Sequence, residues 1–258
     1  LGANNKKSLH CAIRTALLTA AVLGIICSLG GVYFTPHMLN VMSVPSDIYD
    51  ASLIYCRIYF SGLWAMIFYN MLAGILRAFG DSRRPLYVLI LSSIINIVGD
   101  FLLVGVFHTG VGGTAAATVL AQIISAVVLY GILIKADCVN GKLHIFRHKI
   151  CREHMGMMIK KGFPLALQSM LFPISNSIIQ ASVNTMGTNS IAAWGICDKL
   201  DMIIWLIADS MGPALTTYTA QNIGAGKFDR VKKGAFTGVG LSVVSVGTIS
   251  LLLYFCSG

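Results

Sequence analysis

Seven apolar stretches dominate this sequence, and each is long enough to cross a lipid bilayer as a helix. A membrane-spanning helix needs roughly 20 apolar residues to cover a hydrocarbon layer of about 30 Å. The chain of 258 residues is 56% hydrophobic and 11% charged, whereas a soluble domain is about 25% charged. Because it lacks the polar residues to cover a water-soluble core, we expect an all-α, polytopic transmembrane helix bundle. The predicted spans are Thr15–Phe34, Ala51–Ala73, Leu86–Phe107, Gly112–Ile134, Gly162–Met186, Ser190–Thr219 and Ala235–Phe255.

Basic residues gather at every second junction between these spans. Of the 19 Lys and Arg residues, only Arg57 and Lys199 depart from this alternation. Because basic residues are concentrated in cytoplasmic loops, we expect Gly74–Pro85 and the linker 135–161 to lie in the cytoplasm, with Asp81 as a local partner for the arginines. The net charge of +9 then reflects topology and contact with anionic lipid headgroups rather than a nucleic-acid partner. The sequence predicts a multi-pass protein of the cell membrane, inner or plasma.

The two ends of the sequence indicate an internal repeat in a longer protein. Leu1-Gly-Ala and Ile223-Gly-Ala both join a Gly-Ala pair to a basic turn and then to a span, and they lie 222 residues apart. This separation fits one half of a transporter built from two similar halves. The chain begins with Leu and ends after the seventh span, so we expect a fragment.

Polar residues in two neighbouring spans indicate a cation site. Asp100 lies inside an apolar span, where an ionisable side chain is costly and is a functional hypothesis by default. Asn96 precedes it by four residues, so both side chains project from one helix face. Thr118 adds a hydroxyl if the two spans pack as an antiparallel hairpin. These oxygens suit a small cation, and the carboxylate also suits a proton. The alternative is that the three only bond across helices and stabilise packing.

A second set of polar residues lies in the sixth span and in the span before it. Asp198, Asp201 and Asp209 fall near one helix face, and they face a water-filled cavity or pair with Lys199. The functional interpretation is a polar stripe along a substrate cavity. The alternative is a local ion pair together with one hydrogen bond inside the protein. In the preceding span Gln168, Asn176 and Gln180 line the cavity or bond to neighbouring helices.

Motifs of other function classes are weak in this chain. Seven scattered cysteines predict neither a disulfide framework nor a zinc site. His144, His148 and His154 with Cys151 fit a solvated basic linker better than a metal site, because no zinc-like spacing recurs. There is no Walker lysine motif and no recognisable nucleophile–base pair, so we expect neither an ATP-driven pump nor an enzyme. A seven-helix receptor would start outside the cell, whereas the charges place this start inside.

Four motifs together resemble those of the multidrug and toxic compound extrusion (MATE) family, and the likeness runs over the whole chain. They are Leu76–Pro85 (LRAFGDSRRP), Asn96–Asp100 (NIVGD), Gly110–Thr118 (GVGGTAAAT) and Gln221–Lys227 (QNIGAGK), of which the first and last are rather specific.

The resemblance implies two six-helix bundles related by a pseudo-two-fold axis, with this chain holding helices three to nine of twelve. Residues 1–134 would then be the last four helices of the amino-terminal bundle, 135–161 a cytoplasmic linker and 162–258 the first three helices of the carboxyl-terminal bundle.

The resemblance also implies a secondary active antiporter that exports drugs or other organic, cationic compounds in exchange for Na⁺ or H⁺ by alternating access. The matching Asn96, Asp100 and Thr118 would line a cation site in the amino-terminal bundle. It implies a monomer with a small-molecule substrate, surrounded by the bilayer, and no cofactor besides the coupling ion. The alternative is a lipid-linked oligosaccharide flippase of the same superfamily, which needs a more basic cavity than these mostly acidic interior residues provide.

Overall fold

In a computed structural model of the chain, residues 6–41, 44, 46–135, 152–184, 186 and 188–256 are described, and the regular elements in them are all helices. These are α1 (Lys6–Val41), α2 (Ser46–Ser61), α3 (Leu63–Ala78), α4 (Arg83–Asp100), the π-helix η1 (Phe101–Val106), α5 (Gly110–Lys135), α6 (Arg152–Asn184), α7 (Thr188–Gly224) and α8 (Phe228–Cys256).

The seven predicted spans correspond to seven helical stretches, two of which are composite. The α2–α3 stretch bends by 40° at a break between Ser61 and Leu63, and α4 continues directly into η1. Among the described residues, four helices are long and apolar enough to cross a membrane, or five if the bent pair counts as one span. The other two predicted spans, in α6 and α7, contain the amides and acids discussed above, which lower their mean hydropathy.

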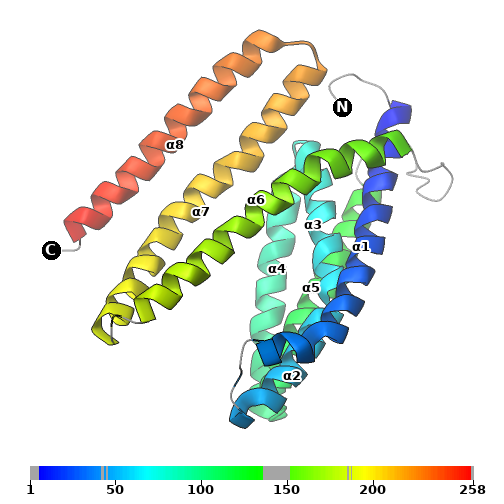
Figure 1. Cartoon of the computed structure of the whole chain (residues 1–258). Helices are drawn as coiled ribbons and strands as arrows, with labels where there is room; N and C mark the ends of the chain where they lie inside the picture. The colour runs from blue at the N-terminus through cyan, green and yellow to red at the C-terminus, as the bar shows by residue number, and fades with distance from the viewer. Residues whose placement is uncertain are drawn as a thin grey trace. The chain divides into compact units, whose positions relative to one another are not determined.

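The chain divides into two compact units. The first unit, Lys6–Met155, contains α1 to α5 with η1. The second unit takes in α6 from Gly156 onward, together with α7 and α8. In the second unit α7 and α8 pack side by side in opposite directions (Figure 1).

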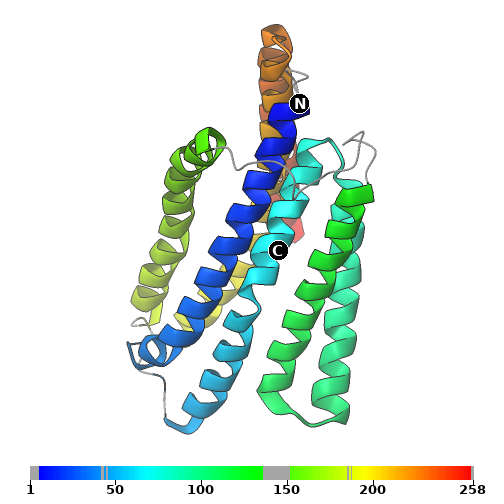
Figure 2. The same cartoon turned by 90° about the vertical axis from the view of Figure 1, so that its right-hand side faces the viewer.

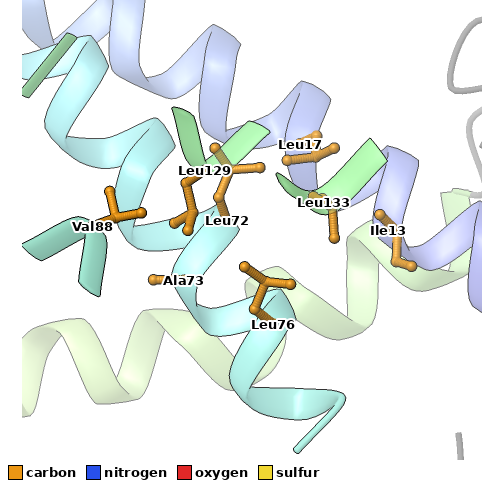
Figure 3. Close-up of a cluster of buried hydrophobic side chains, with 8 residues drawn as sticks. All are labelled: Ile13, Leu17, Leu72, Ala73, Leu76, Val88, Leu129 and Leu133. Carbon is orange, nitrogen blue, oxygen red and sulfur yellow. The ribbon is translucent and has the colours of Figure 1, made fainter. Parts of the chain in front are cut away.

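The core of the first unit forms where α1, α3, α4 and α5 meet (Figure 3). Inside a bilayer, helices associate through close van der Waals packing rather than through escape from water, so buried leucines and small residues hold the unit together. The fully buried members of this cluster are Leu72, Leu76, Leu129 and Leu133, and Ile13, Leu17, Ala73 and Val88 complete it.

Two glycines let helices of the first unit approach closely. A Cβ atom at Gly99 would lie 3.0 Å from the Cβ of Ala117, which brings α4 against α5. A Cβ atom at Gly24 on α1 would lie 2.9 Å from the Cα of Trp64 at the start of α3. Both helix pairs therefore depend on the absence of a side chain at these positions.

The charged junction Gly74–Pro85 contains a tight turn at residues 79–82, while its two ends belong to α3, which ends at Ala78, and to α4, which begins at Arg83. Gly80 has a φ of 85°, a left-handed conformation that favours glycine. Asp81 is the predicted local partner, and this is confirmed: its Oδ2 lies 3.2 Å from Nε of Arg84, and its Oδ1 accepts a hydrogen bond from the Arg84 N–H at 3.1 Å. The expectation from the scattered cysteines was wrong at Cys11 on α1, which takes part in a disulfide bond, because the spacing of cysteines along a sequence does not show which of them come together in space.

Candidate functional site

The hairpin of α4 and α5 brings two of the predicted cation-site residues together. Figure 2 shows these helices side by side and antiparallel. Across the hairpin, Asn96 Nδ2 donates a hydrogen bond to Thr118 Oγ1 at 3.2 Å. The same hydroxyl donates to the main-chain oxygen of Thr114 at 3.0 Å. The hairpin condition stated for Thr118 is therefore met, and its hydroxyl is oriented from both sides.

Asp100 lies one turn beyond Asn96, at the last residue of α4. Its side chain is half-buried, and its Oδ1 is fully buried with no hydrogen-bond partner among the residues that the structure describes. A buried acceptor without a donor is costly, and a cation or a proton at this oxygen would offset that cost. No hydrogen bond joins Asp100 to Asn96 or to Thr118 in the described part of the chain, so the third predicted member is near the pair along α4 but is not bonded to it.

The π-helix η1 begins at the residue after Asp100. Wider π-helical turns inside α-helices are rare and occur frequently at functional sites. Here the change of helical pitch falls beside Gly99, the point where α4 packs closely on α5. The backbone thus departs from regular α-helical geometry directly after Asp100.

The second unit contains a cavity of about 900 Å³ between α6, α7 and α8. Its polar lining includes the three predicted acids of α7 and one predicted amide of α6, namely Asp198, Asp201, Asp209 and Asn176. Its aromatic lining consists of Phe172, Trp194, Trp205 and Tyr254. The rings of Phe172 and Trp205 lie with their centroids 5.0 Å apart at an interplanar angle of 31°.

The remaining predicted cavity residues lie elsewhere. Gln168 and Gln180 are not among the residues that line this cavity. Lys199, the proposed ion-pair partner of the α7 acids, forms no salt bridge within the described residues, so the local ion-pair alternative receives no support. The linker residues His144, His148 and Cys151 lie outside the described residues. Among those described, no group of three His, Cys, Asp or Glu side chains could hold a metal ion.

The sequence interpretation missed three aromatic residues of the cavity, Phe172, Trp194 and Tyr254. A signal was available for two of them. Trp194 precedes Asp198 by four residues and Phe172 precedes Asn176 by four, a spacing that places both members of each pair on one helix face. Tyr254 carries no such signal, because nothing on α8 marks the cavity face.

These features define a class: a polytopic, all-helical membrane protein with oxygen-bearing side chains inside one helix unit and an acidic, aromatic cavity in the other. The MatE family model matches residues 1–102 and 164–258. The chain therefore belongs to the MatE family, a family of membrane transporters rather than of enzymes.

Curated relatives match nearly the whole chain. It is 31% identical over 262 residues to the "Probable multidrug resistance protein YoeA" of Bacillus subtilis, covering 99% of this chain and 57% of that protein. It is 25% identical over 256 residues to the "FAD transporter" of Shewanella oneidensis, covering 92% of this chain and 52% of that one. The chain thus spans about half the length of the curated relatives it matches.

Solved structures share its fold. A MATE protein crystallised in complex with MaD3S superposes with a TM-score of 0.89 at 20% identity, over 98% of this chain and 58% of the other. An outward-facing multidrug resistance MATE transporter of the MOP superfamily gives 0.88 at 20% identity, over 98% and 57%. The predicted fold class, a polytopic helix bundle of this family, is confirmed.

Proposed function

We propose that this chain is the central part of a secondary active antiporter, which exports drugs or other organic cations in exchange for Na⁺ or H⁺. The observation that supports it most is the α4–α5 hairpin, where Asn96 and Thr118 are bonded one turn from a buried carboxylate oxygen of Asp100. Carboxylate, amide and hydroxyl oxygens are the ligands that hard cations prefer. An intramembrane carboxylate is also the usual carrier of a coupled proton.

In this proposal the two units belong to the two bundles of the transporter. Residues 1–134 are the last four helices of the amino-terminal bundle, residues 162–258 are the first three helices of the carboxyl-terminal bundle, and 135–161 links them in the cytoplasm. The transporter works as a monomer and alternates between inward-open and outward-open states. Occupation of the Asp100 site changes the relative stability of these states, which is what exchange against a cation requires.

The cavity of the second unit supports an organic cation as substrate. Three carboxylates line it, and its aromatic rings offer π faces to a cation or to a planar apolar group. The FAD transporter of Shewanella oneidensis and the flippases of the superfamily handle phosphate-bearing, anionic compounds, which a cavity with these acids would repel. A cationic drug therefore fits the cavity better than a nucleotide or a lipid pyrophosphate.

The test replaces Asp100 with Asn in the full-length protein and measures efflux of a fluorescent organic cation from cells. Asparagine keeps the size of the side chain and removes its charge and its titration, so we expect cation-coupled efflux to be abolished at unchanged expression. Asp50→Asn is the matched control, because Asp50 is an exposed acid of α2 and its replacement leaves efflux as in the wild type. Coupled efflux that survives in Asp100→Asn would assign Asp100 to helix packing.

A further inference from the structure

The α2–α3 stretch of the first unit is broken at Gly62. The two helices meet at an angle of 40°, and Gly62 follows Ser61, a Ser–Gly pair of the kind at which sharp helix kinks occur. Gly62 N–H donates to Tyr59 O at 3.1 Å and Ala65 N–H donates to Gly62 O at 3.0 Å, each across three residues rather than four. Because the regular α-helical bonding is already interrupted here, the angle between the helices can change with little further loss of main-chain hydrogen bonds.

The start of α3 is anchored to α1. In an unbroken helix the Trp64 N–H would donate to the main-chain oxygen of Phe60, but here it donates to Ser28 Oγ on α1 at 2.9 Å. Ser28 is itself buried. Four residues of α3 are buried, and three of them belong to the core cluster of the unit. This half of the stretch is therefore held firmly against its neighbours.

The other half, α2, is held more weakly. None of its residues is buried within the unit, although it packs against α1 and α5. Its contact with α5 includes Gly112, where a Cβ atom would lie 3.2 Å from Ile54 Cγ2. Elements with few buried side chains open more readily than the core does. The stretch thus joins a fixed half, α3, to a weakly held half, α2, at Gly62.

The break also lies against the candidate cation site. A Cβ atom at Gly62 would lie 2.9 Å from the Cβ of Val119 on α5, so the main chain of the break touches that side chain directly. Val119 follows Thr118, whose hydroxyl accepts the hydrogen bond from Asn96. A shift of α5 at Thr118 therefore acts on the break itself, since Gly62 has no side chain to absorb it.

We propose that Gly62 is a hinge of the transport cycle, at which α2 pivots against α5 while α3 stays fixed on α1. Ser28 keeps α3 in place by accepting the Trp64 N–H, and occupation of the coupling-ion site sets the angle of α2. Hinges of this kind are a few residues at the ends of helices that absorb the change in backbone direction. The control by the ion rests on the proposed role of Asp100, Asn96 and Thr118, whereas the pivot itself does not.

Paired cysteines test whether α2 moves. The full-length transporter, with its native cysteines replaced, is reconstituted in lipid vesicles, and exchange of a fluorescent organic cation is measured. Ile54→Cys with Gly112→Cys places two thiols at the α2–α5 contact, about 12 Å along α2 from the hinge. Oxidation with copper phenanthroline joins them. We expect exchange to be lost on oxidation and to return on reduction with dithiothreitol.

Gly24→Cys with Trp64→Cys is the matched control, because it joins α1 to the fixed half. A Cβ atom at Gly24 would lie 3.2 Å from the Cβ of Trp64, so the cross-link is equally short. Exchange should continue in this pair after oxidation. Exchange that survives in the cross-linked α2–α5 pair would overturn the hinge. Loss of exchange in both pairs, or in the control alone, would overturn the division into a fixed and a moving half.

Hydrogen exchange of the wild type needs no variant. In lipid nanodiscs at constant pH, the main-chain N–H groups of residues 63–66 should change their exchange rate when saturating Na⁺ or the transported organic cation is added. Those of residues 72–76, at the core end of α3, should not respond. An unchanged rate at residues 63–66 with both additions would overturn the hinge even if no cysteine variant folds.

The hinge and the proposed antiporter fail separately. If Asp100→Asn abolishes coupling while the cross-linked α2–α5 pair still exchanges substrate, the hinge is wrong and the antiporter proposal stands. If Asp100→Asn keeps coupling while the cross-link stops exchange reversibly, the cation site is wrong and the pivot at Gly62 stands.

Discussion

Replacing Thr118 with Val separates a cation ligand from a packing contact. Valine has nearly the shape of threonine but neither accepts the hydrogen bond from Asn96 Nδ2 nor donates to the Thr114 oxygen. Hydrogen bonds between membrane helices contribute about 0.6 kcal/mol on average and at most about 1.7 kcal/mol. We therefore expect Thr118→Val to lower the stability of the purified protein in detergent by about 0.6–1.7 kcal/mol.

The free-energy effect of Thr118→Val on cation binding should be larger than this loss of stability. If Thr118 is a ligand, its loss should raise the half-saturating cation concentration of exchange by about tenfold or more, and each factor of ten corresponds to about 1.4 kcal/mol. The assay is exchange in lipid vesicles over a range of Na⁺ concentration and pH, beside a thermal unfolding curve. Thr118→Ser keeps the hydroxyl and should retain the cation dependence. A Thr118→Val protein that is less stable but has wild-type cation dependence would refute the ligand role.

Three other substitutions test the packing and the substrate cavity. Gly99→Val drives a side chain into α5 and should destabilise the protein by about 1–3 kcal/mol in thermal unfolding, whereas Gly74→Ala, which meets no atom within 4 Å, should not. Leu72→Ala removes a fully buried side chain and should cost about 2–5 kcal/mol; the control Leu120→Ala, at a residue 52% exposed, should stay within about 0.5 kcal/mol. Asp201→Asn removes one of three cavity carboxylates and should raise the KM for a cationic drug several-fold while leaving that of a neutral one; equal shifts for both would contradict the electrostatic role of the cavity.

Most of the fold was predictable because a bilayer imposes a simple length rule on helices. The apolar runs give the seven helical stretches, and the Gly80 turn with its Asp81–Arg84 pair follows from the charged segment between two runs. The break at Ser61–Gly62 was not predicted, since a small residue within an apolar run does not by itself end a membrane helix. The π-helix after Asp100 was also missed, because apolar residues such as Phe101 fit either helical pitch.

The candidate site was predictable as residue types and only partly as geometry. Asn96 and Thr118 were expected to meet, and the antiparallel hairpin brings them into hydrogen-bonding contact. Asp100 lies one turn beyond Asn96 but is not bonded to either residue in the described part of the chain. The spacing of residues along the chain does not show which side chains of neighbouring helices come within bonding distance.

The central claim is that transport is driven by a cation gradient acting at Asp100, and imposed gradients test it most directly. The full-length protein is reconstituted in lipid vesicles without ATP, and accumulation of a fluorescent organic cation is followed while an opposing Na⁺ or H⁺ gradient is applied. We predict accumulation against the substrate's own gradient for one of these ions in the wild type, and none in Asp100→Asn. Accumulation that is independent of both gradients, or equal in the two proteins, would contradict the account.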